Sequence, residues 1–256
     1  MKLATLAMAL VLAFPALVHG AGENPAYIET AVRGGGGIRG VVRFAGAPPR
    51  LKRIFVGKNQ EYCGNSAPSE ALIVSKDGGV KYAVAYLDNV TAGKPVDRNA
   101  PALLTESKCA FVPHVFAIVE GNGIQIKNED PILHNVNISV EGAQRYNRGQ
   151  PIQNQVLFRR LKWTGVAEIT CDAHTHMRSY ALVLGNPYFA VSDETGAFEI
   201  SDIPPGAYTL KVWHESWLVR GDDDDGRPTY GPAILLSKEV TVRRGATERV
   251  EFEINP

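Results

Sequence analysis

The sequence contains few sulfur-bearing side chains. Two of its three methionines lie in the first eight residues, so Met177 is the only methionine in the rest of the chain. Its three cysteines are an odd number, so at least one of them stands outside any disulfide within the chain. Cys171 lies six residues before Met177, which makes this short stretch the first candidate for a functional site.

The chain also lacks an excess of charge of either sign and any long apolar run beyond its N-terminal segment. Its 27 basic side chains are balanced by 27 acidic ones, which argues against nucleic acid as a partner because such proteins usually present a basic face. No later segment is apolar for long enough to span a bilayer, so we expect no membrane span in the mature chain. No long stretch shows a helical period.

The N-terminus has the pattern of an export signal. Lys2 precedes a nearly continuous apolar run, and small residues stand before a cleavage point after Gly20. We predict a signal peptide over residues 1–20, a flexible leader over residues 21–37, and a periplasmic or secreted protein.

From residue 38 onward, short strand-like segments alternate with turn residues. Apolar residues recur at every second position over residues 38–44, 123–128 and 136–140, and Gly, Pro, Asn and Asp stand between the segments. This pattern is typical of β-sandwiches and barrels. The sequence therefore predicts an all-β protein.

Four side chains from two stretches form a ligand set for copper. Cys171, His174 and Met177 lie on a predicted loop between strands, and His134 follows another strand. A thiolate, two imidazoles and a weakly bound thioether are the ligands of a blue-copper centre. The loop can deliver three of them together because the chain doubles back. We therefore predict one type 1 copper ion held by these four residues.

Two alternatives remain open. His176 could replace His174 as the second imidazole, although Met177 is then adjacent to it and reaches the opposite side with difficulty. Zinc could be bound in a tetrahedron of His134, Cys171, His174 and His176, but this reading leaves the methionine unexplained. Taken singly, each residue is more often a structural or core residue.

The stretch 111–184 resembles a cupredoxin, and its Cys-x-x-His-x-x-Met spacing resembles that of amicyanin. The resemblance implies the same four ligands and implies that Asn135 joins the two ligand segments by hydrogen bonds. It also implies a His174 ring edge that reaches solvent. Amicyanin carries prolines beside its second histidine, whereas Ala173 and Thr175 stand here, so we expect a less rigid loop.

Residues 190–210 resemble the carboxypeptidase regulatory-like (transthyretin-like) β-sandwich, and residues 38–46 are similar to the first strand of that module. The resemblances imply a Greek-key cupredoxin sandwich plus a small transthyretin-like β-sandwich. We predict a copper domain over residues 38–185 and the second sandwich over residues 186–256. As an alternative, residues 38–95 belong to the second sandwich, with the copper domain inserted into it.

These patterns predict a protein that transfers single electrons. Its partner would be a redox protein such as a c-type cytochrome or a periplasmic dehydrogenase, with the edge of His174 as the contact point. We expect no enzymatic activity, because four protein ligands leave no open coordination position. The alternatives are a copper chaperone and a non-redox β-sandwich binding module with a structural zinc or no metal.

Other polar side chains receive structural interpretations. Cys63 and Cys109 remain for each other once Cys171 is assigned to copper, and an oxidising compartment favours their disulfide, although both could instead be free and buried. The spacing of Asp222–Asp225 matches no calcium loop, so we predict a solvated loop. We also expect structural roles for His114 and His214.

Overall fold

The computed structural model describes residues 27–256, so the predicted signal peptide and residues 21–26 of the predicted leader lie outside the described residues. The described chain is built of strands, with one short helix, α1 (Gln60–Cys63). This confirms the all-β prediction. Among these residues, no helix has the length and apolar character needed to cross a membrane.

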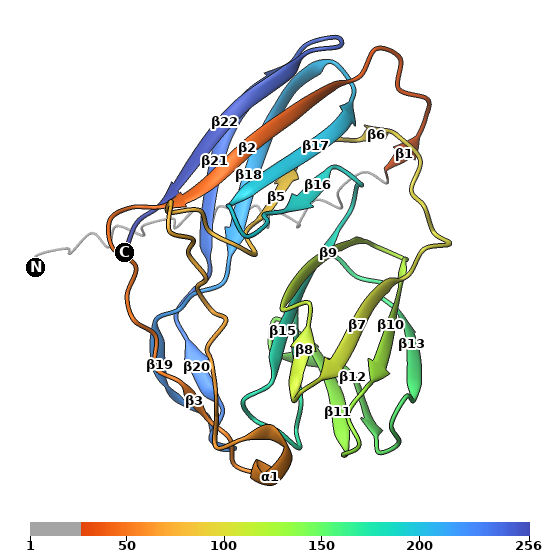
Figure 1. Ribbon diagram of the computed structural model, residues 1–256. Coiled ribbons are helices and arrows are strands. Elements are labelled where there is room, and N and C mark those ends of the chain that lie inside the picture. Colours follow the sequence, from red (N-terminus) through yellow and green to blue (C-terminus); the bar gives the residue numbers. More distant parts are fainter. Residues whose placement is uncertain (1–26) are drawn as a thin grey trace, which may run out of the picture.

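One β-sandwich, here called the flanking sandwich, is assembled from the two ends of the described chain (Figure 1). Its four-stranded sheet has the order β16 (Phe189–Val191), β5 (Val84–Leu87), β18 (Gly206–His214), β21 (Ile234–Val242). Its three-stranded sheet has the order β17 (Ala197–Ile203), β2 (Gly36–Phe44), β22 (Thr247–Ile254). Alternating residues of the two sheets, among them Ile38, Val42 and Leu210, are fully buried in a common core.

A second β-sandwich, here called the central sandwich, is formed by residues 102–184 (Figure 1). Its four-stranded sheet has the order β13 (Val156–Arg160), β10 (Gly123–Asn128), β7 (Ala102–Ser107), β8 (Ala110–Val112). Its five-stranded sheet has the order β12 (Ala143–Gln150), β11 (His134–Val140), β14 (Gly165–Thr170), β15 (Arg178–Leu184), β9 (Val115–Val119). Its core contains Ile126, Ile138 and Ile169.

Three two-stranded pairs within residues 27–256 lie outside these sheets. They are β1 (Ile28–Glu29) with β6 (Ala92–Gly93), β3 (Ile54–Phe55) with β4 (Ser66–Ala67), and β19 (Val219–Asp222) with β20 (Pro228–Tyr230). The segment β3–α1–β4 therefore forms a small hairpin with α1 at its tip. The β19–β20 hairpin extends from the flanking sandwich between β18 and β21 (Figure 1).

The strand pairing differs from the predicted grouping of residues 38–185. β2 pairs with β17 and β22, and β5 pairs with β16 and β18, so residues 36–44 and 84–87 share sheets with residues 189–254. Residues 102–184 therefore lie, in sequence, between strands of the flanking sandwich. The leader predicted to extend to residue 37 also differs, because β1 lies within it and β2 begins at Gly36.

The two sandwiches contact each other through an apolar cluster. Val84 and Trp213 of the flanking sandwich pack with Val115 and Leu182 of the central sandwich, and all four are buried. Buried apolar contact of this kind is the main source of stability between packed layers. The two sandwiches are therefore held together by buried apolar side chains as well as by the chain segments that connect them.

Candidate metal centre

Strand pairing brings the two predicted ligand segments together. β14 pairs antiparallel with both β11 and β15, so the start of β11 lies beside the end of β14. His134 is the first inward residue of β11, and Cys171 continues the inward alternation of Ala167 and Ile169 along β14. The loop from Cys171 to Met177 is closed by a hydrogen bond from the Met177 amide to the His174 carbonyl, 3.0 Å long.

Three donor atoms converge at one point. The Nδ1 atoms of His134 and His174 are 3.1 Å apart, and the Cys171 sulfur lies 4.0 and 3.7 Å from them. Bonds of about 2.0 Å to nitrogen and 2.3 Å to sulfur place the ligands of a single ion roughly 3 to 4 Å apart. All three side chains are buried. The trio can therefore share one metal ion without rearrangement.

The outer nitrogens of both imidazoles have oxygen partners. His134 Nε2 donates to Asp130 Oδ2 at 2.8 Å, and His174 Nε2 donates to Asn59 Oδ1 at 2.9 Å. Because neither oxygen can donate, each ring carries its proton on Nε2, which leaves both Nδ1 lone pairs facing each other. Two lone pairs at this separation repel, and a cation between them removes the repulsion. The donor set therefore fits a metal ion.

Burial sets the protonation of the three donors. It lowers the pKa of His174 to about 4, with help from the neighbouring His134, and it also lowers the pKa of His134, against the effect of Asp130. Burial raises the pKa of the Cys171 thiol to about 11. At neutral pH both imidazoles are thus free to bind, while the thiol has to lose its proton when a metal enters.

The other two predicted residues are placed differently. Met177, at the end of the loop, is buried in the same apolar cluster as Cys171. His176 donates from Nε2 to the carbonyl oxygen of Cys109 at 3.1 Å, and neither of its ring nitrogens belongs to the group of convergent donors. A second group of possible ligands, Cys109, Asp130 and His134, is weakened because the Cys109 sulfur is in a disulfide.

Asn135 joins the two ligand segments. Its amide donates to the Cys171 sulfur at 3.4 Å, and its side-chain oxygen accepts from the Asp172 amide at 2.6 Å. The first bond favours the thiolate, since hydrogen bonds to sulfur stabilise its charged form.

The hairpin β3–α1–β4 covers the site. Asn59, at the start of α1, caps His174, and Tyr62 donates to Asp130, the residue that holds His134, at 2.8 Å. The Cys63–Cys109 disulfide fastens α1 to the central sandwich, which confirms that predicted bond. His174 is only 2% exposed, so the prediction that its ring edge reaches solvent is wrong.

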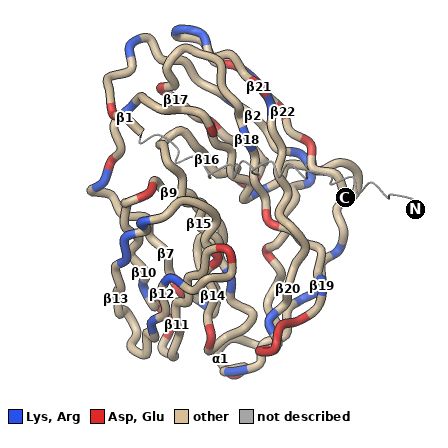
Figure 2. Tube along the Cα trace, turned by 180° about the vertical axis from the view of Figure 1, so that it is seen from behind, with Lys and Arg blue, Asp and Glu red and all other residues tan. Residues whose placement is uncertain are grey.

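The remaining polar candidates have structural partners. His114 contacts the Glu215 carboxylate, and this charge raises the pKa of His114 even though burial alone lowers it. His214 contacts the Glu215 carbonyl at 2.7 Å. Asp222–Asp225 form an exposed turn at the end of the β19–β20 hairpin, visible as acidic residues in Figure 2.

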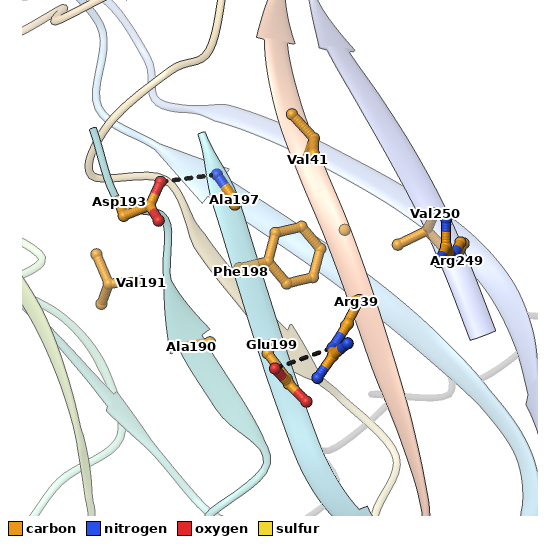
Figure 3. A pocket seen from close by; sticks show the side chains of 11 residues that line it. Arg39, Val41, Ala190, Val191, Asp193, Ala197, Phe198, Glu199, Arg249 and Val250 are labelled. Carbon is orange, nitrogen blue, oxygen red and sulfur yellow. Dashed lines mark hydrogen bonds and ion pairs between the residues drawn. The ribbon is translucent and has the colours of Figure 1, made fainter. Parts of the chain in front are cut away.

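A surface pocket on the flanking sandwich offers no comparable chemistry (Figure 3). It is lined by Phe198, by small apolar residues, by Asp193 and Arg249, and by the exposed Arg39–Glu199 ion pair, whose atoms are 3.0 Å apart. No histidine or cysteine lies among its lining residues.

The sequence interpretation missed three residues around the ligands, namely Asn59, Asp130 and Arg227. Asp130 stands four residues before His134, a separation that could have suggested a contact. Asn59 lies 115 residues from His174, and Arg227 lies 56 residues from Cys171, whose carbonyl it contacts. No local pattern marks either residue.

No protein-family model matches the chain, and no curated protein matches it significantly. Among solved structures, it is similar to a copper-containing nitrite reductase from Thermus scotoductus (17% identity, TM-score 0.30, 34% of this chain and 23% of the reductase). It is also similar to a reduced Cu(I) amicyanin variant (16%, 0.31, 33% and 83%) and a purple cupredoxin from Nitrosopumilus maritimus (17%, 0.28, 32% and 98%). This chain spans less than a quarter of the reductase. The likeness covers about a third of the chain, so the chemistry has to be argued from its own side chains.

Proposed function

We propose that this protein binds one copper ion through His134, Cys171 and His174, with Met177 as a weak fourth ligand, and that it exchanges single electrons. The observation that carries the proposal is the buried convergence of two Nδ1 atoms and one sulfur within 4.0 Å. When bound, copper would supply the one-electron couple, and the soft sulfur ligands suit both of its oxidation states. The protein's part is to hold the donors and exclude water.

The zinc alternative has less support in the side-chain arrangement. A structural zinc site is closed by four strong ligands, and His176 would have to be the fourth. His176 is not among the side chains whose donor atoms converge with those of His134, Cys171 and His174. The nearby buried thioether of Met177 is the soft donor that a copper site uses and a zinc site does not need.

We infer that the protein is exported and meets a redox partner of the c-type cytochrome or dehydrogenase kind. The disulfide supports export, because disulfides persist in oxidising compartments. The partner has to approach the covering hairpin, since Asn59 rather than solvent contacts the outer edge of His174. We also propose that the flanking sandwich is a transthyretin-like module into which the central sandwich is inserted.

Copper loading tests the proposal directly. Purified metal-free protein, given one equivalent of Cu(II), is expected to develop an intense absorption at about 600 nm and narrow copper hyperfine splitting, as blue-copper sites do. Reduction should bleach the colour reversibly. A protein that stays colourless with copper and retains stoichiometric zinc in competition would overturn the copper assignment.

Asp130→Ala is expected to weaken copper binding by about 10- to 100-fold, because Asp130 holds the His134 tautomer that leaves Nδ1 free. Competition titration with a chelator of known affinity measures the effect. Glu129→Ala is the matched control, since it removes the same charge from the neighbouring position, where the carboxylate pairs with Lys127. Equal affinities for the two folded variants would show that Asp130 plays no part in holding the ligand.

A further inference from the structure

Arg227 of the β19–β20 hairpin extends its side chain into the ligand loop. Its Nη2 donates to the Cys171 carbonyl at 3.1 Å, and its Nη1 lies 3.3 and 3.4 Å from the carbonyls of Thr175 and Met177. The residue is only 8% exposed. One guanidinium thus contacts the beginning and the end of the loop that carries three of the four proposed ligands.

The turn of the hairpin holds Arg227 in place. Asp223 Oδ1 accepts from the Arg227 amide at 2.8 Å, the Asp223 amide donates to the Arg227 carbonyl at 2.9 Å, and Asp223 Oδ2 lies 3.7 Å from the guanidinium Nε. Next to it, Arg178 Nη2 donates to the Pro228 carbonyl at 2.7 Å. The hairpin is therefore fastened both to the loop and to the start of β15.

The contacts of Arg227 restrict a loop whose own sequence restricts its backbone little. Ala173 and Thr175 leave the backbone of residues 171–177 freer than prolines would. Buried carbonyls that lose their donors cost free energy, and a planar guanidinium with five N–H groups can satisfy several of them at once. The loop is therefore constrained from outside, by a residue of the β19–β20 hairpin that extends from the flanking sandwich.

The charge of Arg227 acts on the same site. A guanidinium keeps its positive charge at all accessible pH values, and a buried charge is poorly screened. Reduction of copper lowers the charge of the centre by one unit, so a nearby positive charge favours the reduced state. This effect requires an ion that changes its oxidation state. A structural zinc ion does not, so the charge of Arg227 would have no comparable effect on a zinc site.

We propose that Arg227 is a positioning residue of the copper centre, by which the flanking sandwich fixes the ligand loop and raises the reduction potential. This inference rests on the proposed function for its redox part, while the fixing of the loop can be measured in metal-free protein. It also gives the flanking sandwich a role at the metal centre.

The experiment compares Arg227→Gln and Arg227→Lys with the wild type, and Arg220→Gln is the control. Arg220 is an exposed arginine of the same hairpin, so its replacement makes the same change in net charge. In metal-free protein, amide hydrogen exchange of residues 171–177 is expected to be at least tenfold faster in both Arg227 variants and unchanged in the control. In copper-loaded protein, Arg227→Gln should shift the redox equilibrium at least tenfold toward Cu(II), or about 59 mV for one electron. Arg227→Lys, which keeps the charge, should shift it less.

The outcomes separate the two proposals. If the wild type forms no blue site but loop exchange still depends on Arg227, the copper function fails and the fixing of the loop stands. If the blue site forms and neither loop exchange nor potential differs between the Arg227 and Arg220 variants, the inference about Arg227 is overturned. Should Arg227→Gln not fold, Arg227→Lys decides, because unchanged loop exchange in that folded variant also overturns it.

Discussion

Replacing Cys171 with serine is expected to abolish the intense visible absorption of the copper-loaded protein. The colour of a blue-copper site depends on the copper–thiolate bond, and a serine hydroxyl is a hard ligand that stays protonated at neutral pH. Cys171 is fully buried and serine is of similar size, so the fold should tolerate the change. Absorption and electron paramagnetic resonance spectra of wild-type and variant protein, each with one equivalent of Cu(II), measure the effect.

Two histidine variants accompany this measurement. His174→Gln should lose the blue spectrum, because it removes one of the two converging Nδ1 atoms. His176→Gln should keep it, because the ring of His176 is not among the convergent donors. The reverse pattern would assign the second imidazole to His176, and a blue Cys171→Ser protein would place the chromophore elsewhere.

The ligand loop could be predicted because its information is local. Cys171 follows two inward residues of β14 at the strand period, and the antiparallel return through Met177 needs only a tight loop. The disulfide followed from counting, since one of three cysteines was already assigned to the metal. The interpretation of the loop thus rests on a few neighbouring residues, whereas the disulfide prediction rests on a count of the cysteines along the chain.

The assembly of the flanking sandwich was harder to predict because alternation shows which face a strand buries but does not identify its partners. β2 pairs in parallel with β22 near the opposite end of the chain. The predicted flexible leader extends to residue 37, yet a Cβ at Gly36 would come within 2.5 Å of the Arg243 carbonyl oxygen, so close packing requires glycine there. A Cβ at Gly40 would come within 2.2 Å of the Phe198 ring. Glycines that permit close packing and glycines that permit flexibility look the same in a sequence.

The hairpin over His174 and the contact from Arg227 could not be predicted either, because no local pattern in the sequence identifies a distant partner. Both come from polar residues in irregular segments, which carry no hydrophobic period. The exposed ring edge implied by the cupredoxin resemblance describes a single sandwich, whereas here the β3–α1–β4 hairpin lies over that edge. A ligand motif therefore does not specify the residues that other segments of the chain place around the site.

Glu106 of β7 has a second large expected effect, this time on stability. Its side chain is fully buried, and neither carboxylate oxygen has a hydrogen-bond partner among the described residues. Burial, with the charge of Asp130 as a smaller cause, raises the pKa of Glu106 to about 8 from an ordinary value of 4.5. The folded protein therefore holds this carboxyl in its neutral form at neutral pH.

Between pH 4.5 and about 8 the folded protein keeps a proton on Glu106 that the unfolded chain releases. The Glu106 contribution to the free energy of unfolding therefore falls as pH rises through this window, by up to about 1.4 kcal/mol per pH unit. Above pH 8 both states are ionised and the loss stays constant. Glu106→Gln keeps the volume but removes the titration, so it should stabilise the protein by a few kcal/mol at pH 8 and change little below pH 5.

Urea unfolding of metal-free wild type and Glu106→Gln at pH 5, 7 and 9 measures this effect, with the exposed Glu120→Gln as control. The difference between Glu106→Gln and wild type should grow with pH, while the control follows the wild type. Parallel pH profiles for all three proteins would mean that Glu106 is solvated or paired in the folded state. Because the charge of Glu106 also opposes formation of the Cys171 thiolate, its neutral form at pH 7 leaves that thiolate freer to form when a metal binds.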